Sequence, residues 1–448
     1  MILHKCEGKE VMRVSTWAVL AAALSLLASS CSNAPPPDGG TGGSGGGSEE
    51  ADWIEDPSVW PEVALREPPE GFRLQQGLSS GLRFKPLKWE GCGGGCESTS
   101  VSEFDLTTEV GMSALGIGLA THPYVTVVHT LQREDGSSNL VRRLVRLKDG
   151  ETVAALRLVP VASNQAPDGL LTLRPETATT LMVRDNPRKG TIFASFDPTK
   201  GWEFKQPWDT DDLRFSTWCK VFDLESSPSM VFFACDQALQ VMDGAGSSST
   251  FSLATSNLAI AGAGNHGLAV WSETPIVGPL VSMIQAWVSK DDVRLLGQIN
   301  GEVCGLGVGA DRVVGFRGAP ATGSLSCGKP LLSPQFFTLS RTGGDLRQSP
   351  ALDRAYQAEV LSTWEDFAAT RLKADDGSVG IALVRLSDWK IRMFPTPAGR
   401  SLKTSSVVVD ETYIYFNVDF DEPGKVGIVD RVYRYRLDQF DNLGDPMN

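Results

Sequence analysis

Residues 407–416 read VVVDETYIYF, and after a polar loop containing Pro423-Gly424 residues 432–438 read VYRYRLD. The first run is apolar and rich in β-branched and aromatic residues. The second alternates large and charged residues. Both patterns are typical of β-strands, and a loop with Pro and Gly is typical of the connection between two strands. We therefore expect two neighbouring strands here, and we take them as the template of a repeated unit.

The end of the second strand recurs along the chain as a short apolar run that closes on a large hydrophobe before a polar turn. The seven markers are Leu147, Phe196, Met242, Val288, Leu339, Leu386 and Leu437, and successive markers are 46 to 51 residues apart. A period of about 40 to 50 residues is typical of the four-stranded blades of a β-propeller. We therefore predict an all-β fold, a β-propeller of seven four-stranded blades over residues 111–448. Six or eight blades, a β-sandwich or another all-β fold are the alternatives.

Residues 52–110 are rich in proline and contain two possible short strands, 82–84 and 101–106. A propeller ring is often closed by an early strand that completes the last blade, because closure removes the exposed sheet edges. We expect one of these two segments to complete the blade formed by residues 407–437.

The chain opens with an export signal. Arg13 precedes an apolar run over residues 17–28, about half the length that a membrane-spanning helix needs. The run ends in Leu27-Ala28-Ser29-Ser30-Cys31, which resembles the lipobox of bacterial lipoproteins, where signal peptidase II cuts before a cysteine that then carries the lipid. The resemblance implies a signal peptide over residues 1–30 and a lipid on Cys31. An ordinary secretory signal is the alternative.

Residues 31–51 continue with Pro, Gly and Ser and have no apolar face, so they cannot pack into a core. Lipoproteins use such tethers to hold a folded body away from the membrane, and two or more acyl chains anchor stably. In a Gram-negative cell Ser32, unlike Asp, is not a signal for retention in the inner membrane. The resemblance therefore implies a cell-envelope protein that is held, through the lipid on Cys31, in the outer membrane.

The charge balance limits the partners. Residues 1–30 hold three basic and two acidic residues, so the remaining chain has 38 Lys and Arg against 52 Asp and Glu, a net charge of −14. An acidic chain is unsuited to nucleic acid and to anionic lipid head groups. We therefore expect no nucleic-acid partner.

Six cysteines remain when Cys6 and the lipidated cysteine are set aside, and an even number in an exported chain suggests three disulfides. They are Cys92, Cys96, Cys219, Cys235, Cys304 and Cys327. Six cysteines allow 15 pairings. A hairpin with its turn at Ser226-Ser227-Pro228 would place Cys219 opposite Cys235, three glycines between Cys92 and Cys96 would let these two join, and Cys304 with Cys327 follows by elimination. A redox dithiol or a metal pair is the alternative for Cys92 and Cys96.

Motifs that suggest chemistry are few. Gly77-Leu78-Ser79-Ser80-Gly81 fits the pattern around a nucleophilic serine but lacks the strand-to-helix turn that exposes it. Residues 262–267, Gly-Ala-Gly-Asn-His-Gly, fit a dinucleotide-binding pattern, but residues 268–271 predict another strand rather than a helix, so we expect a tight hairpin. His122 and His129 are seven residues apart and fall on opposite faces of one strand.

Acidic loops at Asp209–Asp212 and Asp419–Glu422 carry the oxygen ligands that Ca²⁺ prefers, but neither matches an established calcium loop, and solvated turns explain them. We therefore assign no cofactor, with Ca²⁺ as the alternative, and we name no catalytic, cofactor-binding or metal-ligating residue. The sequence favours a binding protein over an enzyme.

We expect a lipid-anchored propeller that binds a protein or an envelope polysaccharide through loops at one mouth of the ring, because a rigid scaffold with loops of variable length suits binding. The alternative is a propeller-type hydrolase or lyase that acts on polysaccharide. Such an active site gathers carboxylate, histidine or tyrosine side chains from several blades around the channel. A role in outer-membrane assembly is a third possibility.

Overall fold

The structure is a computed structural model of the 448-residue chain. It describes residues 60–65, 72–77, 86–100, 109–113, 124–132, 138–160, 172–175, 180–184, 192–197, 201–205, 220–224, 230–235, 238–242, 248–252, 257–265, 268–275, 278–289, 292–320, 329–358, 361–395, 400–401, 407–420 and 429–447. The predicted signal peptide and tether lie outside these residues. Within these ranges, no helix has both the length and the apolar character needed to cross a membrane.

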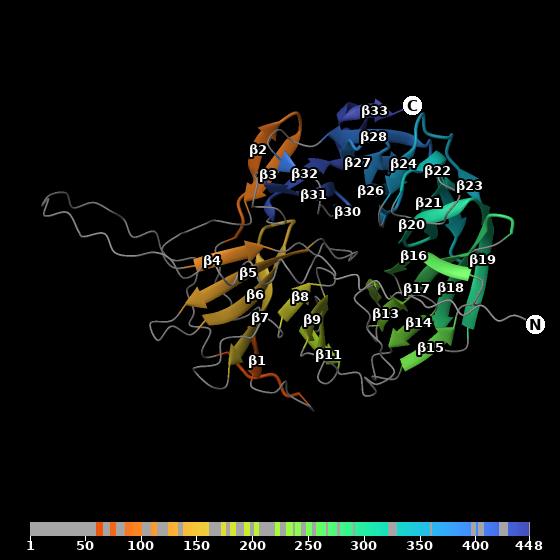
Figure 1. Ribbon diagram of the computed structural model, residues 1–448. Helices are drawn as coiled ribbons and strands as arrows, with labels where there is room; N and C mark the ends of the chain where they lie inside the picture. Colours follow the sequence, from red (N-terminus) through yellow and green to blue (C-terminus); the bar gives the residue numbers. More distant parts are fainter. Residues whose placement is uncertain are drawn as a thin grey trace, which may run out of the picture. The chain divides into compact units, whose positions relative to one another are not determined.

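Regular structure in the described residues is β-strand, apart from the 3-10 helix η2 (Leu437–Asn442). The ladders between named strands are antiparallel, and strands close in sequence are neighbours in the sheets (Figure 1). Local pairing of this kind is what short strands joined by turns produce. The prediction of an all-β fold is confirmed.

The first four sheets follow one another along the chain. The first has the order β1-β7-β6-β5-β4, with β1 (Phe72–Gly77), β4 (Glu109–Ser113), β5 (Tyr124–Gln132), β6 (Ser138–Arg146) and β7 (Thr152–Pro160). The second holds β8 (Thr172–Pro175), β9 (Thr180–Arg184), β10 (Ile192–Asp197) and β11 (Gly201–Lys205). The third holds β12 (Lys220–Leu224), β13 (Met230–Cys235), β14 (Ala238–Met242) and β15 (Ser248–Ser252), and the fourth β16 (Asn257–Asn265), β17 (Leu268–Pro275), β18 (Val281–Ser289) and β19 (Asp292–Asn300).

The remaining strands form two larger sheets. One contains β20 (Glu302–Val308), β21 (Arg312–Pro320), β22 (Leu331–Ser340), β23 (Arg347–Gln348), β24 (Tyr356–Ala358), β25 (Ser362–Trp364), β26 (Phe367–Ala374), β27 (Val379–Arg385), β28 (Lys390–Pro395) and β33 (Asp445–Met447). The other contains β2 (Glu90–Gly93), β3 (Cys96–Ser100), β29 (Arg400–Ser401), β30 (Val407–Val409), β31 (Tyr413–Phe420) and β32 (Val429–Arg436). In the first of these, β24 pairs with both β22 and β26 and so joins two sets of strands.

The seven sequence markers fall at equivalent places in the strand order. Each lies near the end of, or directly after, the third strand of a consecutive set, on β6, β10, β14, β18, β22, β27 and β32. Leu147, Leu386 and Leu437 directly follow their strands and are buried, between 0% and 7% exposed. At these three markers and at Leu339 a large side chain anchors the end of a strand in the core, whereas the marker Val288 is 37% exposed.

The template stretch itself differs from the prediction in one respect. Residues 407–416 hold two strands, β30 and β31, which pair with each other. Asp410 interrupts the run, because its Oδ1 accepts hydrogen bonds from the backbone N–H groups of Thr412 (2.8 Å) and Tyr413 (2.7 Å). A carboxylate that binds the backbone two and three residues ahead stabilises a turn rather than an extended strand.

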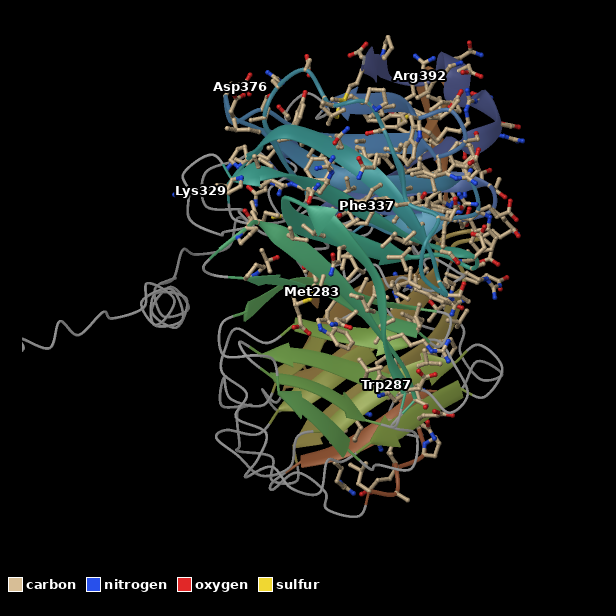
Figure 2. The ribbon with its side chains drawn as sticks, turned by 90° about the vertical axis from the view of Figure 1, so that its right-hand side faces the viewer. Met283, Trp287, Lys329, Phe337, Asp376 and Arg392 are labelled. Atoms are coloured by element: carbon tan, nitrogen blue, oxygen red, sulfur yellow. A yellow bond between two sulfur atoms is a disulfide. The ribbon has the colours of Figure 1, made fainter. Side chains whose placement is uncertain are left out.

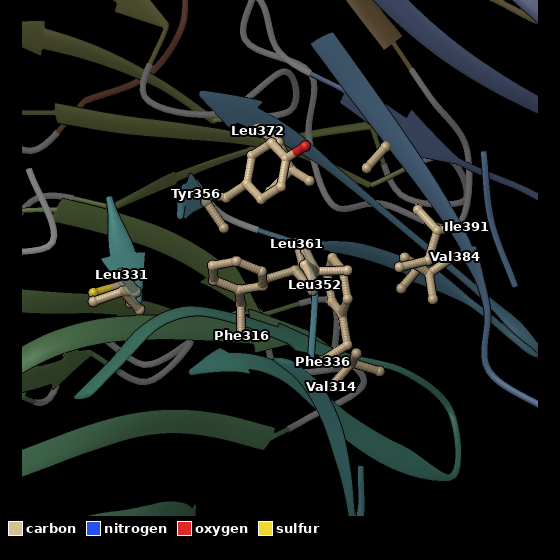
Figure 3. Packing of buried hydrophobic residues seen from close by; sticks show 14 of the residues in the cluster. Val314, Phe316, Leu331, Phe336, Leu352, Tyr356, Leu361, Leu372, Val384 and Ile391 are labelled. Carbon is tan, nitrogen blue, oxygen red and sulfur yellow. The ribbon is translucent and has the colours of Figure 1, made fainter. Parts of the chain in front are cut away.

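The core lies between successive sets of strands, since side chains alternate between the two faces of each strand. β31, for example, sends Ile414 and Phe416 into one cluster and Tyr415 into another. Figure 3 shows such a cluster, in which Phe316 and Phe336 from β21 and β22 pack with side chains from β26 to β28. Similar clusters join β16–β18 to β20–β22, β26–β28 to β30–β32, β6 and Leu147 to β30–β32, and β5–β7 to β10 and β11. Each large apolar side chain buried in this way contributes about 1.5 to 3 kcal/mol.

An early strand pairs with β32, as expected, but the segment is not one of the two that the sequence indicated. β3 lies beside β32, with Cys96 opposite Tyr435 and Ser100 opposite Arg431 (Figure 1). Residues 82–84 and 101–106 are outside the described residues. β3 was missed because its sequence, CESTS, carries no apolar alternation.

Candidate functional site

The predicted disulfide residues are placed only in part. Cys92 and Cys96 lie at the turn of the β2–β3 hairpin, with their Cα atoms 5.1 Å apart, a separation that a disulfide spans. Cys304 on β20 is disulfide-bonded. Cys219, Cys327 and the predicted lipidation site Cys31 lie outside the described residues. The three pairings therefore stay predictions.

The hairpin that motivated one pairing is present. β12 pairs with β13 in the register Leu224 opposite Met230 and Lys220 opposite Ala234. Cys235 ends β13, and Cys219 precedes the first described residue of β12, so the pairing of these two cysteines stays a prediction.

Most residues of the motifs that could carry chemistry lie outside the part of the chain that the structure describes. Ser79, His122, His266 and the acidic loop 209–212 lie outside the described residues. His129 lies on β5, opposite Gly111 and Val141. In the part of the chain that the structure describes, no group of three or more His, Cys, Asp or Glu residues is arranged to hold a metal ion.

The glycine-rich stretch over residues 262–267 belongs to a hairpin. β16 ends at Asn265, β17 begins at Leu268, and these two residues pair with each other. A strand therefore follows the glycines where a dinucleotide-binding loop requires a helix. The interpretation as a tight hairpin is confirmed.

One cluster of aromatic and charged side chains joins three segments that are far apart in the sequence. Arg434 on β32 lies at its centre and is 7% exposed. Its guanidinium carbon is 4.0 Å from the ring centroid of Trp89 and 4.3 Å from that of Tyr413. Its Nε donates to Glu97 Oε2 at 2.6 Å, and its Nη1 donates to the carbonyl oxygen of Lys148 at 3.2 Å. These five residues are the Arg434 cluster.

Strand register explains how the cluster forms. Arg434 is directly opposite Glu97 on one side and Tyr415 on the other, and residues directly opposite each other share a face of the sheet. Trp89 is fixed separately, because its Nε1 donates to the carbonyl oxygen of Leu147 at 3.1 Å. The cluster thus holds the segment before β2, the turn after β6 and the last strands together.

Burial dominates the electrostatics beside this cluster. Burial raises the pKa of Asp410, despite the two backbone hydrogen bonds that its carboxylate accepts. Burial also raises the pKa of Tyr415, and the nearby charge of Asp410 raises it further. Tyr415 is therefore neutral at physiological pH, while the ionised form of Asp410 is disfavoured by its surroundings.

The arrangement suits a structural role for Arg434. Stacking of a cation on an aromatic ring is worth about 0.5 to 2 kcal/mol, and two ring centroids lie within 4.3 Å of the guanidinium carbon of Arg434. With two rings in contact and with Nε and Nη1 donating to protein oxygens, the guanidinium positions chain segments rather than a reacting group. The sequence offered only a faint signal, the alternation in YRYR, which puts Arg434 on the same strand face as the buried Val432.

Three of the five exposed large apolar side chains among the described residues lie on the neighbouring strands β18 and β19. The large hydrophobic residues with more than a third of their surface exposed, among those described, are Val288, Val293, Leu295, Leu332 and Leu346. Val288, Val293 and Leu295 lie on β18 and β19. Leu346 follows a turn in which the N–H of Gly344 donates to the carbonyl oxygen of Leu296 on β19 at 3.0 Å. Val288, Val293, Leu295 and Leu346 are the β19 patch.

No protein-family model matches the chain, and no curated protein sequence does. Among solved structures, it is similar to the β-propeller domain of the Trilobed protease from Pyrococcus furiosus, at a TM-score of 0.42 and 11% identity over 73% of this chain and 93% of that one. It is also similar to TolB from Acinetobacter baumannii, at a TM-score of 0.33 and 10% identity over 68% and 78% of the two chains. A third is the polysaccharide lyase Uly1, at a TM-score of 0.39 and 9% identity over 70% and 88%.

Proposed function

We propose that the chain is a lipid-anchored protein of the bacterial cell envelope, and that its folded body is a seven-bladed β-propeller that binds a protein partner. Each of the seven blades would hold one marker at the end of its third strand, and β2 and β3 would complete the last blade. The clusters that join consecutive sets of strands support this arrangement, because a blade that packs on both faces needs a neighbour on each side.

The observation that carries the binding role is the β19 patch. Its side chains are aliphatic and between 37% and 50% exposed. Aliphatic surface suits a protein partner, whereas a polysaccharide is bound mainly through polar groups and through aromatic rings that stack on its sugars. An apolar patch on the surface of a soluble domain marks an interaction site.

The proposed anchor is tested by Cys31→Ser. The substituted chain is expected in the soluble fraction of a cell lysate, and the unaltered chain in the membrane fraction. Retention of the variant in the membrane fraction would overturn lipid anchoring at Cys31.

The proposed binding role is tested by cross-linking a tagged full chain in membranes and identifying what is retained. A protein should be retained by the chain and lost from Leu295→Lys, because lysine puts a charge into the β19 patch. Leu332→Lys is the matched control, since Leu332 is 47% exposed and lies outside the patch. Recovery of no protein, together with turnover of a glycan or an ester, would refute the binding role and favour the hydrolase or lyase.

A further inference from the structure

β19 is the outer strand of its sheet. It comes last in the order β16-β17-β18-β19, so one of its edges has no strand partner among the described residues. Some outer edges carry a further strand, since β1 pairs with β7, β33 with β28 and β2 with β3, whereas β11, β15 and β19 each end their sheets in the part of the chain that the structure describes. An edge strand with open backbone groups is a template for pairing with another chain.

The apolar side chains at this edge are the β19 patch. Val293 is 42% exposed and Leu295 is 50% exposed, and the two lie on the same face of the strand because they are two residues apart. Trp287 on β18 is directly opposite Val293 and is 3% exposed (Figure 2). The patch therefore begins where the buried surface of the sheet ends.

The charged residues of β19 would complement each other across a pair of antiparallel copies of the strand. Asp292 and Arg294 share the other face of β19, and Arg294 Nε donates to Asp292 Oδ1 at 2.7 Å. Two copies of β19 that pair antiparallel about a twofold axis at Val293 would set each Asp292 opposite Arg294 of the other copy. Opposite charges directly across an antiparallel pair are favourable, and a twofold axis produces the contact twice.

We propose that β19 pairs antiparallel with β19 of a second copy of this chain, with Val293 on the twofold axis. This inference rests on the proposed binding role and names the partner of the β19 patch. The paired stretch of β19 is short for two reasons. The carbonyl oxygen of Leu296 already accepts a hydrogen bond from the N–H of Gly344. The ladder with β18 also shifts register between Leu295 and Gly297, so β19 is irregular there. A short pairing of this kind gives a weak dimer that forms at high local concentration.

Charge exchange tests the geometry. Asp292→Arg sets Arg opposite Arg, and Arg294→Asp sets Asp opposite Asp, so each single variant should be monomeric. The double variant restores opposite charges and should dimerise. An equimolar mixture of the two single variants should form a mixed dimer, because one then carries two arginines and the other two aspartates.

The measurement is sedimentation velocity of the purified full chain up to about 100 µM, a range in which weak contacts are populated. Asp438→Arg is the matched control. It breaks an exposed ion pair of the same spacing, with Arg436, away from β19, and should leave the dimer unchanged. Circular dichroism checks that each variant is folded.

The unaltered chain should dimerise, and its dissociation constant should rise at least tenfold in each single variant. A chain that stays monomeric, or single variants that dimerise as the unaltered chain does, would overturn the inference. If the tagged chain then retains a different protein from membranes, the proposed binding role stands without the dimer. If it retains none, both are refuted.

Discussion

Gly315 is a position where one methyl group should destabilise the fold. It lies on β21 directly opposite Phe337 on β22. A Cβ placed on Gly315 would lie 2.1 Å from Phe337 Cζ and 2.3 Å from its Cε1. The ring has no free space to move into, because Phe337 is fully buried in the cluster that joins β16–β18 to β20–β22.

The expected cost of Gly315→Ala follows from two opposing effects. Forcing an extra methyl group into a packed core costs about 1 to 3 kcal/mol. Replacing glycine by alanine also restricts the unfolded chain, which returns about 0.4 to 1 kcal/mol. Taking the middle of each range, we expect the free energy of unfolding to fall by about 1.3 kcal/mol, measured by denaturant titration.

Phe337→Leu provides the test of mechanism. Alone it should destabilise by leaving space in the core. In combination with Gly315→Ala it should cost less than the sum of the single effects, because the smaller side chain makes room for the methyl group. Gly91→Ala is the control, since nothing lies within 4 Å of a Cβ at Gly91 and its φ is not positive. An unchanged stability of Gly315→Ala, or strictly additive effects in the double variant, would refute the argument.

Three further predictions concern the last strands. Asp410→Asn keeps the acceptor of the turn but removes a buried charge. Because folding raises the pKa of Asp410, the unaltered protein loses stability as the pH rises above about 4 and the carboxylate ionises. The variant should therefore melt at a higher temperature than the unaltered chain at pH 7, and at no higher temperature at pH 3. Arg434→Lys loses the planar stack and should lower the free energy of unfolding by about 2 kcal/mol, whereas Glu97→Gln should cost less because Glu97 is 40% exposed; equal costs in denaturant titration would contradict this. Ending the chain at Gly444 removes β33 and uncovers the edge of β28, so light scattering should detect faster aggregation on heating.

The recurrence of the strand sets could be predicted from the sequence because several of them have a large buried side chain at the end of the third strand, although Val288 is 37% exposed. Leu147 and Leu386, for example, are almost fully buried. The hairpins at residues 220–235 and 257–275 could be predicted as well, since their turns carry Pro, Gly or Asn between apolar runs. These signals are local, and they determine structure within a few residues of where they stand.

The contacts between distant segments could not be predicted in the same way. β3 consists of small and polar residues, and its Ser98 and Thr99 are each 2% exposed although neither is apolar. Only the strand beside it makes that burial possible, because Arg431 Nη1 donates to the Ser98 hydroxyl oxygen at 3.1 Å. Trp89 likewise shows no local pattern that predicts its stacking on Arg434. A pairing that depends on a partner more than 300 residues away leaves no periodicity in either segment.

The Arg434 cluster is best understood as the counterpart of the apolar clusters between the other strands. β31 and β32 can bury aliphatic and aromatic side chains against their neighbours on both faces, but β3 brings few such side chains to the edge of β32. Polar contacts replace the missing apolar ones, since Glu97 from β3 pairs with Arg434 and the rings of Trp89 and Tyr413 contact the guanidinium. The guanidinium of this pair is buried, although Glu97 is 40% exposed, so a shift of register would leave a buried charge without its partner, and the contact depends on correct register more strictly than an apolar contact does. The polar strand is therefore held in one register by the ion pair, where an apolar strand would be held by its pattern of burial.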